Sequence, residues 1–483
     1  MNELIKKIAA LSKLSKVLEP NMTHRDQYYA QVNSFSNEFI QSLGDQKTFN
    51  PAPPETPLFA ISEKTKTLEE IINIFQKEVP NKGINAASGK HFGYIPGGGI
   101  FSASLGDFMV AVSNEYAGMH YASPGGVAME NELIRWMCTL FDYPATAIGN
   151  LTSGGSIANL IALTSARDKH QIKGALIEKS VIYLSKQAHH CIQKALRIIG
   201  LEDCIIRYVD IDNRSRMLPL ELDALIRQDI DKGLNPFLVV ASAGTTDTGA
   251  VDPLEEIALI SKKYQLWFHV DAAYGGFFKL IDSKNDLFKG IELSDSLVVD
   301  PHKGLFLPYG IGAVLVKDKK AVFHSHHQTA SYMQDALQDS SPLNPADVSP
   351  ELTRHFRGMR MWLPLQLHGI KPFKACLEEK LYLTEYMRSE LQRIGFSLGP
   401  EPDLSVSYFW YSSKTTDLNR FNRKLLDHMH ANGSSFFSST LINNQFVIRI
   451  AILSFRTKLK EVDQAILMIE ECLDKTLCYF EEK

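Results

Sequence analysis

The stretch SLVVDPHKGLFLPY, residues 296–309, decides the fold and the chemistry of this chain. It opens with the apolar run Leu297-Val298-Val299, which predicts a buried strand. The letters DPHKG follow, so Lys303 lies just beyond the end of that strand. An ammonium group is poorly solvated in such a place. We therefore expect burial to lower the pKa of Lys303 and to make its amine available for a Schiff base.

A second apolar run, LWFHV at residues 266–270, ends in Asp271. If the two strands are neighbours, Asp271 and Lys303 lie close together at one edge of a sheet. Pyridoxal phosphate requires this pair, because the lysine holds the aldehyde carbon and the carboxylate keeps the pyridine nitrogen protonated. Either motif alone could come from an ordinary α/β protein, as a core aspartate or a surface lysine. Both motifs in this order are much harder to explain in that way. The two motifs together predict a pyridoxal phosphate site.

The composition excludes several other classes of protein. A chain of 483 residues, 45% hydrophobic and 22% charged, is long enough for a large domain and one or two smaller ones. Its net charge of −4, without a long basic run, argues against nucleic acid as a partner. No stretch of 18 apolar residues predicts a membrane span, and the first residues do not resemble a cleaved signal peptide. The six cysteines form no CxxC pair, so we expect reduced cysteines and a cytoplasmic protein.

A turn rich in glycine predicts where the phosphate binds. Gly155 and Ser156 precede an Ala- and Leu-rich run that reads as a helix. The free N–H groups and the dipole at a helix N-terminus favour an anion, although such a turn also occurs without any ligand. The chain has no GxxxxGK[ST] and no strand-linked GxGxxG, which argues against a nucleotide as that anion.

Taken with their order, HVDAAYGG at residues 269–276 and DPHKG at residues 300–304 resemble a known family. It is the family of pyridoxal-phosphate-dependent decarboxylases that includes DOPA decarboxylase and glutamate decarboxylase. The resemblance implies an α/β fold of the aspartate-aminotransferase type, fold type I. This fold has a large domain with a mostly parallel seven-stranded sheet, a small C-terminal α/β domain and an N-terminal helical arm.

The same resemblance sets the expected domains and the expected assembly. We expect the helical arm at residues 1–85, the cofactor-binding domain at residues 86–370 and the small domain at residues 371–483. In the family the arm lies across a partner subunit. The expectation is therefore a homodimer with shared active sites.

The resemblance also assigns roles to individual residues. Lys303, His189, Asp271 and Tyr332 are expected to be catalytic, with His189 from SKQAHH stacking on the ring and Tyr332 reaching the partner's site. The residues expected to bind the cofactor are Lys303, Asp271, Ala273, His189, Gly155, Ser156, Thr246 and His302. Asp300 replaces the usual asparagine of the family. A carboxylate near a phosphate is unfavourable unless it is paired or turned away, so we do not assign Asp300 to the phosphate.

The expected reaction is decarboxylation of an L-amino acid to its amine, with aromatic substrates as one class. An aldehyde synthase uses the same scaffold, but its resembled members tend to carry phenylalanine where this chain has Tyr332. A lyase or an aminotransferase of the same fold is a further alternative, and Arg449 could then hold the α-carboxylate. The last alternative is a scaffold that binds the cofactor without turnover.

Two departures weaken the transfer of aromatic specificity from the family to this chain. Gly304 stands where animal aromatic amino acid decarboxylases carry tryptophan, and the loop with glycines at 97–99 also differs. The polar stretch 328–350 contains Tyr332 and predicts a long loop of the kind that acts as a lid. Three histidines, His324, His326 and His327, lie too close together for an independent metal site, and we predict no metal.

Overall fold

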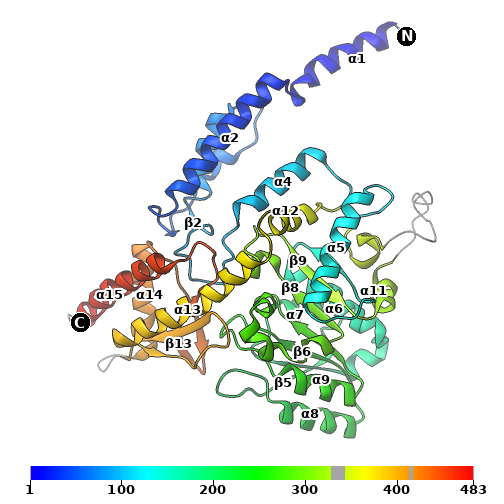
Figure 1. The fold of residues 1–483 in the computed structure, drawn as a ribbon, viewed down its shortest axis with the longest axis vertical. Coiled ribbons are helices and arrows are strands. Elements are labelled where there is room, and N and C mark those ends of the chain that lie inside the picture. Colours follow the sequence, from blue (N-terminus) through cyan, green and yellow to red (C-terminus); the bar gives the residue numbers. More distant parts are fainter. Residues whose placement is uncertain (1, 328–342, 413–416, 482–483) are drawn as a thin grey trace.

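The computed structural model describes residues 2–327, 343–412 and 417–481, and its largest part is built on a seven-stranded sheet (Figure 1). The strands lie in the order β3-β9-β8-β7-β6-β4-β5. Neighbours from β8 to β5 pair in parallel, whereas β9 runs antiparallel to β8 and to β3. The strands are β3 (Ile148–Thr152), β4 (Ser180–Ser185), β5 (Ile205–Val209), β6 (Asn235–Ser242), β7 (Trp267–Asp271), β8 (Ser296–Val299) and β9 (Gly312–Val316).

Helices cover both faces of this sheet, which explains why its central strands read as continuous apolar runs. Successive side chains of a strand point to opposite faces. In β4, Tyr183 therefore packs in one core and Leu184 in the other. The first core includes α5 (Pro124–Leu140), α8 (Pro219–Asp231) and α9 (Leu254–Lys263). The second includes α6 (Gly155–Lys169), α7 (Cys191–Ile198) and α11 (Lys319–His326).

A second, smaller sheet lies toward the C-terminus. It is antiparallel, in the order β10 (Ser397–Leu398), β11 (Val406–Trp410), β13 (Gln445–Ala451) and β12 (Ser438–Ile442). The helices α13 (Lys371–Arg393), α14 (Leu418–Asn432) and α15 (Leu459–Glu481) pack with it around a separate apolar core. Before them, α12 (Gly358–His368) packs against α4 (Phe101–Ser113). The domain limits at residues 85 and 370 stay sequence-based predictions.

The N-terminal residues form helices that extend away from the two sheets (Figure 1). Neither α1 (Asn2–Ser15) nor α2 (Met22–Ser42) contains a buried residue. They are followed by α3 (Leu68–Glu78), which begins with a capping box between Thr67 and Glu70. At the base of the arm, β1 (Phe49–Asn50) pairs with β2 (Gly83–Ile84), and the N–H of Phe49 donates to the carbonyl of Gly433. The arm is thus attached at its base and touches α4 through Tyr29 and Phe108, whereas the side chains of α1 and α2 stay largely exposed.

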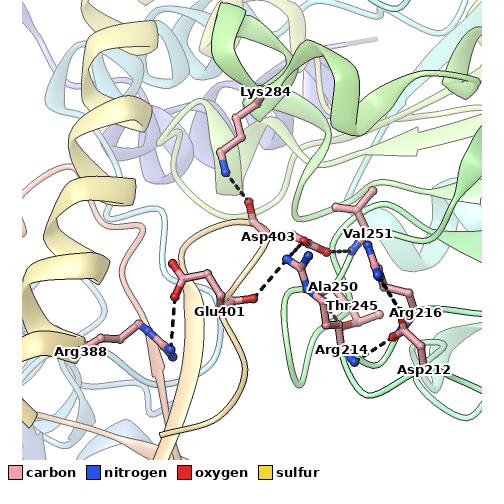
Figure 2. A network of polar contacts seen from close by, with 10 residues as sticks. All are labelled: Asp212, Arg214, Arg216, Thr245, Ala250, Val251, Lys284, Arg388, Glu401 and Asp403. Atoms are coloured by element: carbon pink, nitrogen blue, oxygen red, sulfur yellow. Dashed lines mark hydrogen bonds and ion pairs between the residues drawn. The ribbon is translucent and has the colours of Figure 1, made fainter. Parts of the chain in front are cut away.

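A polar network ties the segment before β11 to the larger sheet (Figure 2). The Asp403 carboxylate accepts hydrogen bonds from Arg214 Nη2 at 2.5 Å and from the N–H of Val251 at 2.9 Å. Its carbonyl accepts from Lys284 Nζ at 2.8 Å. Asp403 is buried, so these bonds are shielded from water. The network fixes the end of the loop 245–251, which begins at the wall of the cavity described below.

Candidate active site

One cavity lies at the carboxyl ends of the parallel strands, the edge of an α/β sheet where ligands bind. Its volume is about 270 Å³. The start of α6, the loop after β4, the ends of β6 and β7, and the short helix α10 (Pro301–Gly304) after β8 form its walls. All eight residues predicted to bind the cofactor line it: Gly155, Ser156, His189, Thr246, Asp271, Ala273, His302 and Lys303. Tyr332 lies outside the described residues.

Lys303 is held by a carboxylate that the sequence analysis left without a role. Its Nζ lies 3.1 Å from Asp300 Oδ2, and the Asp300 side chain is 3% exposed. Burial by itself lowers the pKa of Lys303, but the carboxylates of Asp300 and Asp271 outweigh it, so the net pKa is raised. The expectation of a lowered pKa is therefore wrong. The sequence placed the amine in a poorly solvated position but did not reveal that an anion would point at it.

Asp271 ends β7 with both carboxylate oxygens hydrogen-bonded. Oδ1 accepts from the N–H of Ala273 at 3.1 Å, and Oδ2 accepts from Asn159 Nδ2 at 3.2 Å. Bonds of this kind stabilise the ionised form of a carboxylate. Asn159 was missed by the sequence analysis. The available signal was a lone amide within the apolar run IANLIAL after the glycine turn.

Each of the two histidines of the site has one ring nitrogen whose role is set by a backbone partner. His302 faces the carbonyl of Ile311 with Nδ1, which must therefore carry the proton. His189 Nδ1 accepts from the N–H of Cys191 at 3.3 Å, which leaves the proton on Nε2. Burial lowers the pKa of both His189 and His302. The neighbouring His190 is exposed, and its ring centroid lies 4.1 Å from that of His189.

The start of α6 forms a narrow cradle beside Asp300. A Cβ on Gly155 would lie 2.9 Å from Asp300 Oδ2 and 3.4 Å from Ala273 Cβ. Glycine is therefore needed for this close approach. The first N–H groups of a helix lack intrahelical partners and suit an anion such as phosphate. Asp300 Oδ1 is buried and has no hydrogen-bond partner among the described residues.

Arg449 does not stand free to hold a substrate carboxylate. Its guanidinium donates to the carbonyls of Thr246 and Asp247 and to Ser438 Oγ. It therefore joins β13 to the loop that carries Thr246. These contacts argue against the role that an aminotransferase would require of this residue.

The comparison with protein families decides the identity. Residues 56–412 match the model of the pyridoxal-dependent decarboxylase conserved domain. The chain belongs to this family. It is a pyridoxal-phosphate-dependent amino acid decarboxylase, and pyridoxal phosphate is its cofactor, as predicted.

Similar proteins span most of the chain. The aromatic-L-amino-acid decarboxylase of Bacillus atrophaeus is 29% identical over 418 residues, which cover 85% of this chain and 86% of that protein. Phenylacetaldehyde synthase of Arabidopsis thaliana is 27% identical over 421 residues, covering 84% and 86%. The structure of TDC from Oryza sativa, solved with PLP and tryptamine, covers 95% of this chain and 99% of its own, with a TM-score of 0.89 and 21% identity. These likenesses confirm the predicted fold type.

The described residues contain no group of three or more side chains placed to hold a metal ion. Within the same part of the chain, no helix is both long and apolar enough to cross a membrane.

Proposed function

We propose that this cavity removes the α-carboxylate of an aromatic L-amino acid and releases the corresponding amine. The observation that carries the proposal is that Lys303 and Asp271 line the same cavity. Relatives named as aromatic-L-amino-acid, tryptophan and tyrosine decarboxylases support the aromatic class.

The residues present fit pyridoxal phosphate. Lys303 would hold the aldehyde carbon, and the Gly155 cradle with Ser156 and His302 would hold the phosphate. Asp271 would face the pyridine nitrogen, with His189 and Ala273 on the two faces of the ring and Thr246 at its edge. When bound, the cofactor supplies a conjugated ring that takes up the electron pair left when carbon dioxide departs.

The protein's own part is to hold protons where the reaction needs them. Asp271, whose carboxylate is oriented by two hydrogen bonds, would hold a proton on the ring nitrogen. Asp300 holds the Lys303 ammonium until the amine is required. When the bond from Cα to the carboxylate breaks, Cα must gain a proton to give the amine. We assign that proton to the Tyr332 hydroxyl, following the resemblance.

Gly304 and the glycine loop at residues 97–99, where this chain departs from the aromatic decarboxylases, do not enlarge the cavity. A Cβ on Gly304 would lie 2.7 Å from Phe277 Cβ, so the ring of Phe277 packs where a side chain would stand. A Cβ on Gly97 would lie 2.1 Å from the carbonyl oxygen of His302. Both glycines therefore serve close packing around α10. Neither counts against an aromatic substrate.

An aldehyde synthase is the second candidate, because one relative is a phenylacetaldehyde synthase. It would use the same cavity and would release an aldehyde in place of the amine. Tyr332 favours the decarboxylase, since a phenol at this place supplies the proton that leads to amine.

The assembly we propose is a homodimer. The uncovered helix α1 exposes Leu4, Ile8 and Leu11 by 54–65%, and α4 exposes Phe108 and Val112 by 51–67%. Monomers rarely leave such apolar surfaces in water. We assign Tyr332 to the partner's cavity, following the resemblance. Mixed dimers of Lys303→Ala and Tyr332→Phe subunits should then regain one working site, whereas proven exchange without recovery would show that the loop does not act across subunits.

We also propose a cytoplasmic location. All six cysteines are free, and four of them are buried. A protein with no disulfide suits a reducing compartment. Labelling of free thiols in intact cells against a periplasmic or secreted marker would test this.

The test of the reaction is a panel of substrates. The protein with pyridoxal phosphate is incubated with each proteinogenic amino acid, DOPA, 5-hydroxytryptophan and diaminobutyrate, and carbon dioxide, amine and aldehyde are measured. Equal amounts of carbon dioxide and amine from aromatic substrates are expected, with Lys303→Ala as the blank. Turnover confined to acidic or basic substrates would overturn the aromatic class, and aldehyde as the main product would favour the second candidate.

A further inference from the structure

A chain of buried polar side chains runs through the apolar core behind Asp271. Trp267, His269 and Asp271 alternate along β7 and so point to one face of the sheet. Ser296 lies opposite His269 in the paired strand β8. Asn159 reaches the same face from α6. Trp267, Ser296, His269 and Asn159 are at most 3% exposed.

Each member of this chain is hydrogen-bonded to the next. Trp267 Nε1 lies 2.8 Å from Ser296 Oγ, which lies 2.8 Å from His269 Nδ1. His269 Nε2 lies 2.7 Å from Asn159 Oδ1. Asn159 Nδ2 lies 3.2 Å from Asp271 Oδ2. The surroundings are apolar, so every one of these bonds replaces one lost to water.

The two ends of this hydrogen-bond chain fix the direction in which its members donate. An indole N–H can only donate, and an ionised carboxylate can only accept. Ser296 therefore accepts from Trp267 and gives its own proton to His269 Nδ1. His269 must then be the neutral tautomer with its proton on Nε2, which donates to the Asn159 oxygen. That contact turns the amide so that its N–H group faces Asp271.

Burial lowers the pKa of His269 to about 4, in agreement with a neutral ring. A second proton on Nδ1 would also leave the Ser296 hydroxyl without this acceptor. The chain thus has one proton arrangement that satisfies all its members, and that arrangement ends with a donor on Asp271.

We propose that Trp267, Ser296, His269 and Asn159 are positioning residues that hold a hydrogen-bond donor against the Asp271 carboxylate, so that the proton between Asp271 and the ring nitrogen of the bound cofactor would stay on nitrogen. A donor to the carboxylate stabilises the anion and so favours this placement over a neutral pair. Loss of a hydrogen bond to a charged acceptor changes the ratio between a proton on the ring nitrogen and a proton on the carboxylate by about tenfold or more. The proposal rests on the proposed role of Asp271.

Removal of the Ser296 hydroxyl would release this constraint. Without it, His269 can carry its proton on Nδ1, and the Asn159 amide can turn its oxygen toward Asp271. An oxygen facing the carboxylate repels the anion. Ser296→Ala therefore acts on the ring nitrogen from a distance, through the tautomer of His269.

The test is the nitrogen NMR signal of ring-labelled pyridoxal phosphate bound to the protein. In Ser296→Ala and His269→Leu we expect at least half of the signal to move toward the unprotonated position, with partial recovery in His269→Gln, whose amide can donate to Asn159. Ser294→Ala is the matched control. Ser294 is equally buried, and its hydroxyl is hydrogen-bonded to Tyr143 and Ile291, which are not among the positioning residues.

A wild-type signal in folded Ser296→Ala would overturn the proposal, as would an equal change in Ser294→Ala. If Ser296→Ala does not fold, His269→Leu makes the test, because it removes the donor that orients the Asn159 amide. Asp271→Asn separates the role of Asp271 from that of the four positioning residues. If it leaves the signal unchanged, the proposed role of Asp271 fails; if it alone moves the signal, only the positioning chain fails.

Discussion

Replacing Asp300 by asparagine should make Lys303 reactive at lower pH. The two charged groups lie 3.1 Å apart and are largely buried. At an effective dielectric constant of 20 this separation corresponds to about 5 kcal/mol, an upper limit of about four pKa units. Asp271 also raises the pKa of Lys303 and stays in place. We therefore expect the pKa of Lys303 to fall, by less than this limit.

The assay is the rate at which the cofactor-free protein captures pyridoxal phosphate, followed by absorbance across a pH series. Only the neutral amine attacks the aldehyde, so the rate rises with pH through the pKa of Lys303. Each unit by which this pKa falls raises the capture rate below it by about tenfold.

Asp295→Asn is the control for this prediction. Asp295 is a partly buried carboxylate at the other end of β8, where it accepts from the N–H of Phe268. Its loss should leave the midpoint of the pH series unchanged. If Asp300→Asn also leaves the midpoint unchanged, or moves it upward, Asp300 is not the group that holds the Lys303 proton.

Asp271→Asn should keep the cofactor bound but reduce turnover by about a hundredfold or more, measured at saturating cofactor, because the amide cannot favour a protonated ring nitrogen; near-normal turnover would assign that task to another group. Tyr332→Phe should shift the product from amine toward aldehyde and peroxide in air but not under nitrogen, and an unchanged amine rate would remove Tyr332 from the mechanism. Arg354→Met removes the cation that lies 2.6 Å from the buried Glu130 carboxylate. It should therefore lower the free energy of unfolding by about 3–5 kcal/mol. For a chain of 483 residues that lowers Tm by about 3–5 °C. Adding Glu130→Gln should restore part of the loss, and a Tm within error of wild type in Arg354→Met alone would contradict the reasoning.

The parts of the fold that the sequence predicted are those with strong local patterns. The runs at residues 266–270 and 297–299 are continuous and apolar because helices cover both faces of the sheet, so the strands and the positions of Asp271 and Lys303 at their ends could be predicted. The antiparallel direction of β9 could not, because its run of apolar residues looks the same in either direction.

The site could be predicted as a set of residues but not as a set of contacts. Asp300 was recognised as a departure, yet its pairing with Lys303 depends on a side-chain orientation that no pattern shows. Arg449 contacts the carbonyls of a loop more than two hundred residues away, so its partners were not visible in sequence. Asn159 looked like an ordinary helix residue, and only the packing of α6 on β7 places it beside Asp271.

Lys303 is the residue expected to carry the cofactor, and chemical trapping tests this most directly. The protein loaded with pyridoxal phosphate is reduced with borohydride, digested and mapped by mass spectrometry. We predict one pyridoxyl group per chain, on Lys303, and none on the reduced Lys303→Ala protein. A pyridoxyl group on another lysine of the wild-type protein, or on none, would contradict the central claim.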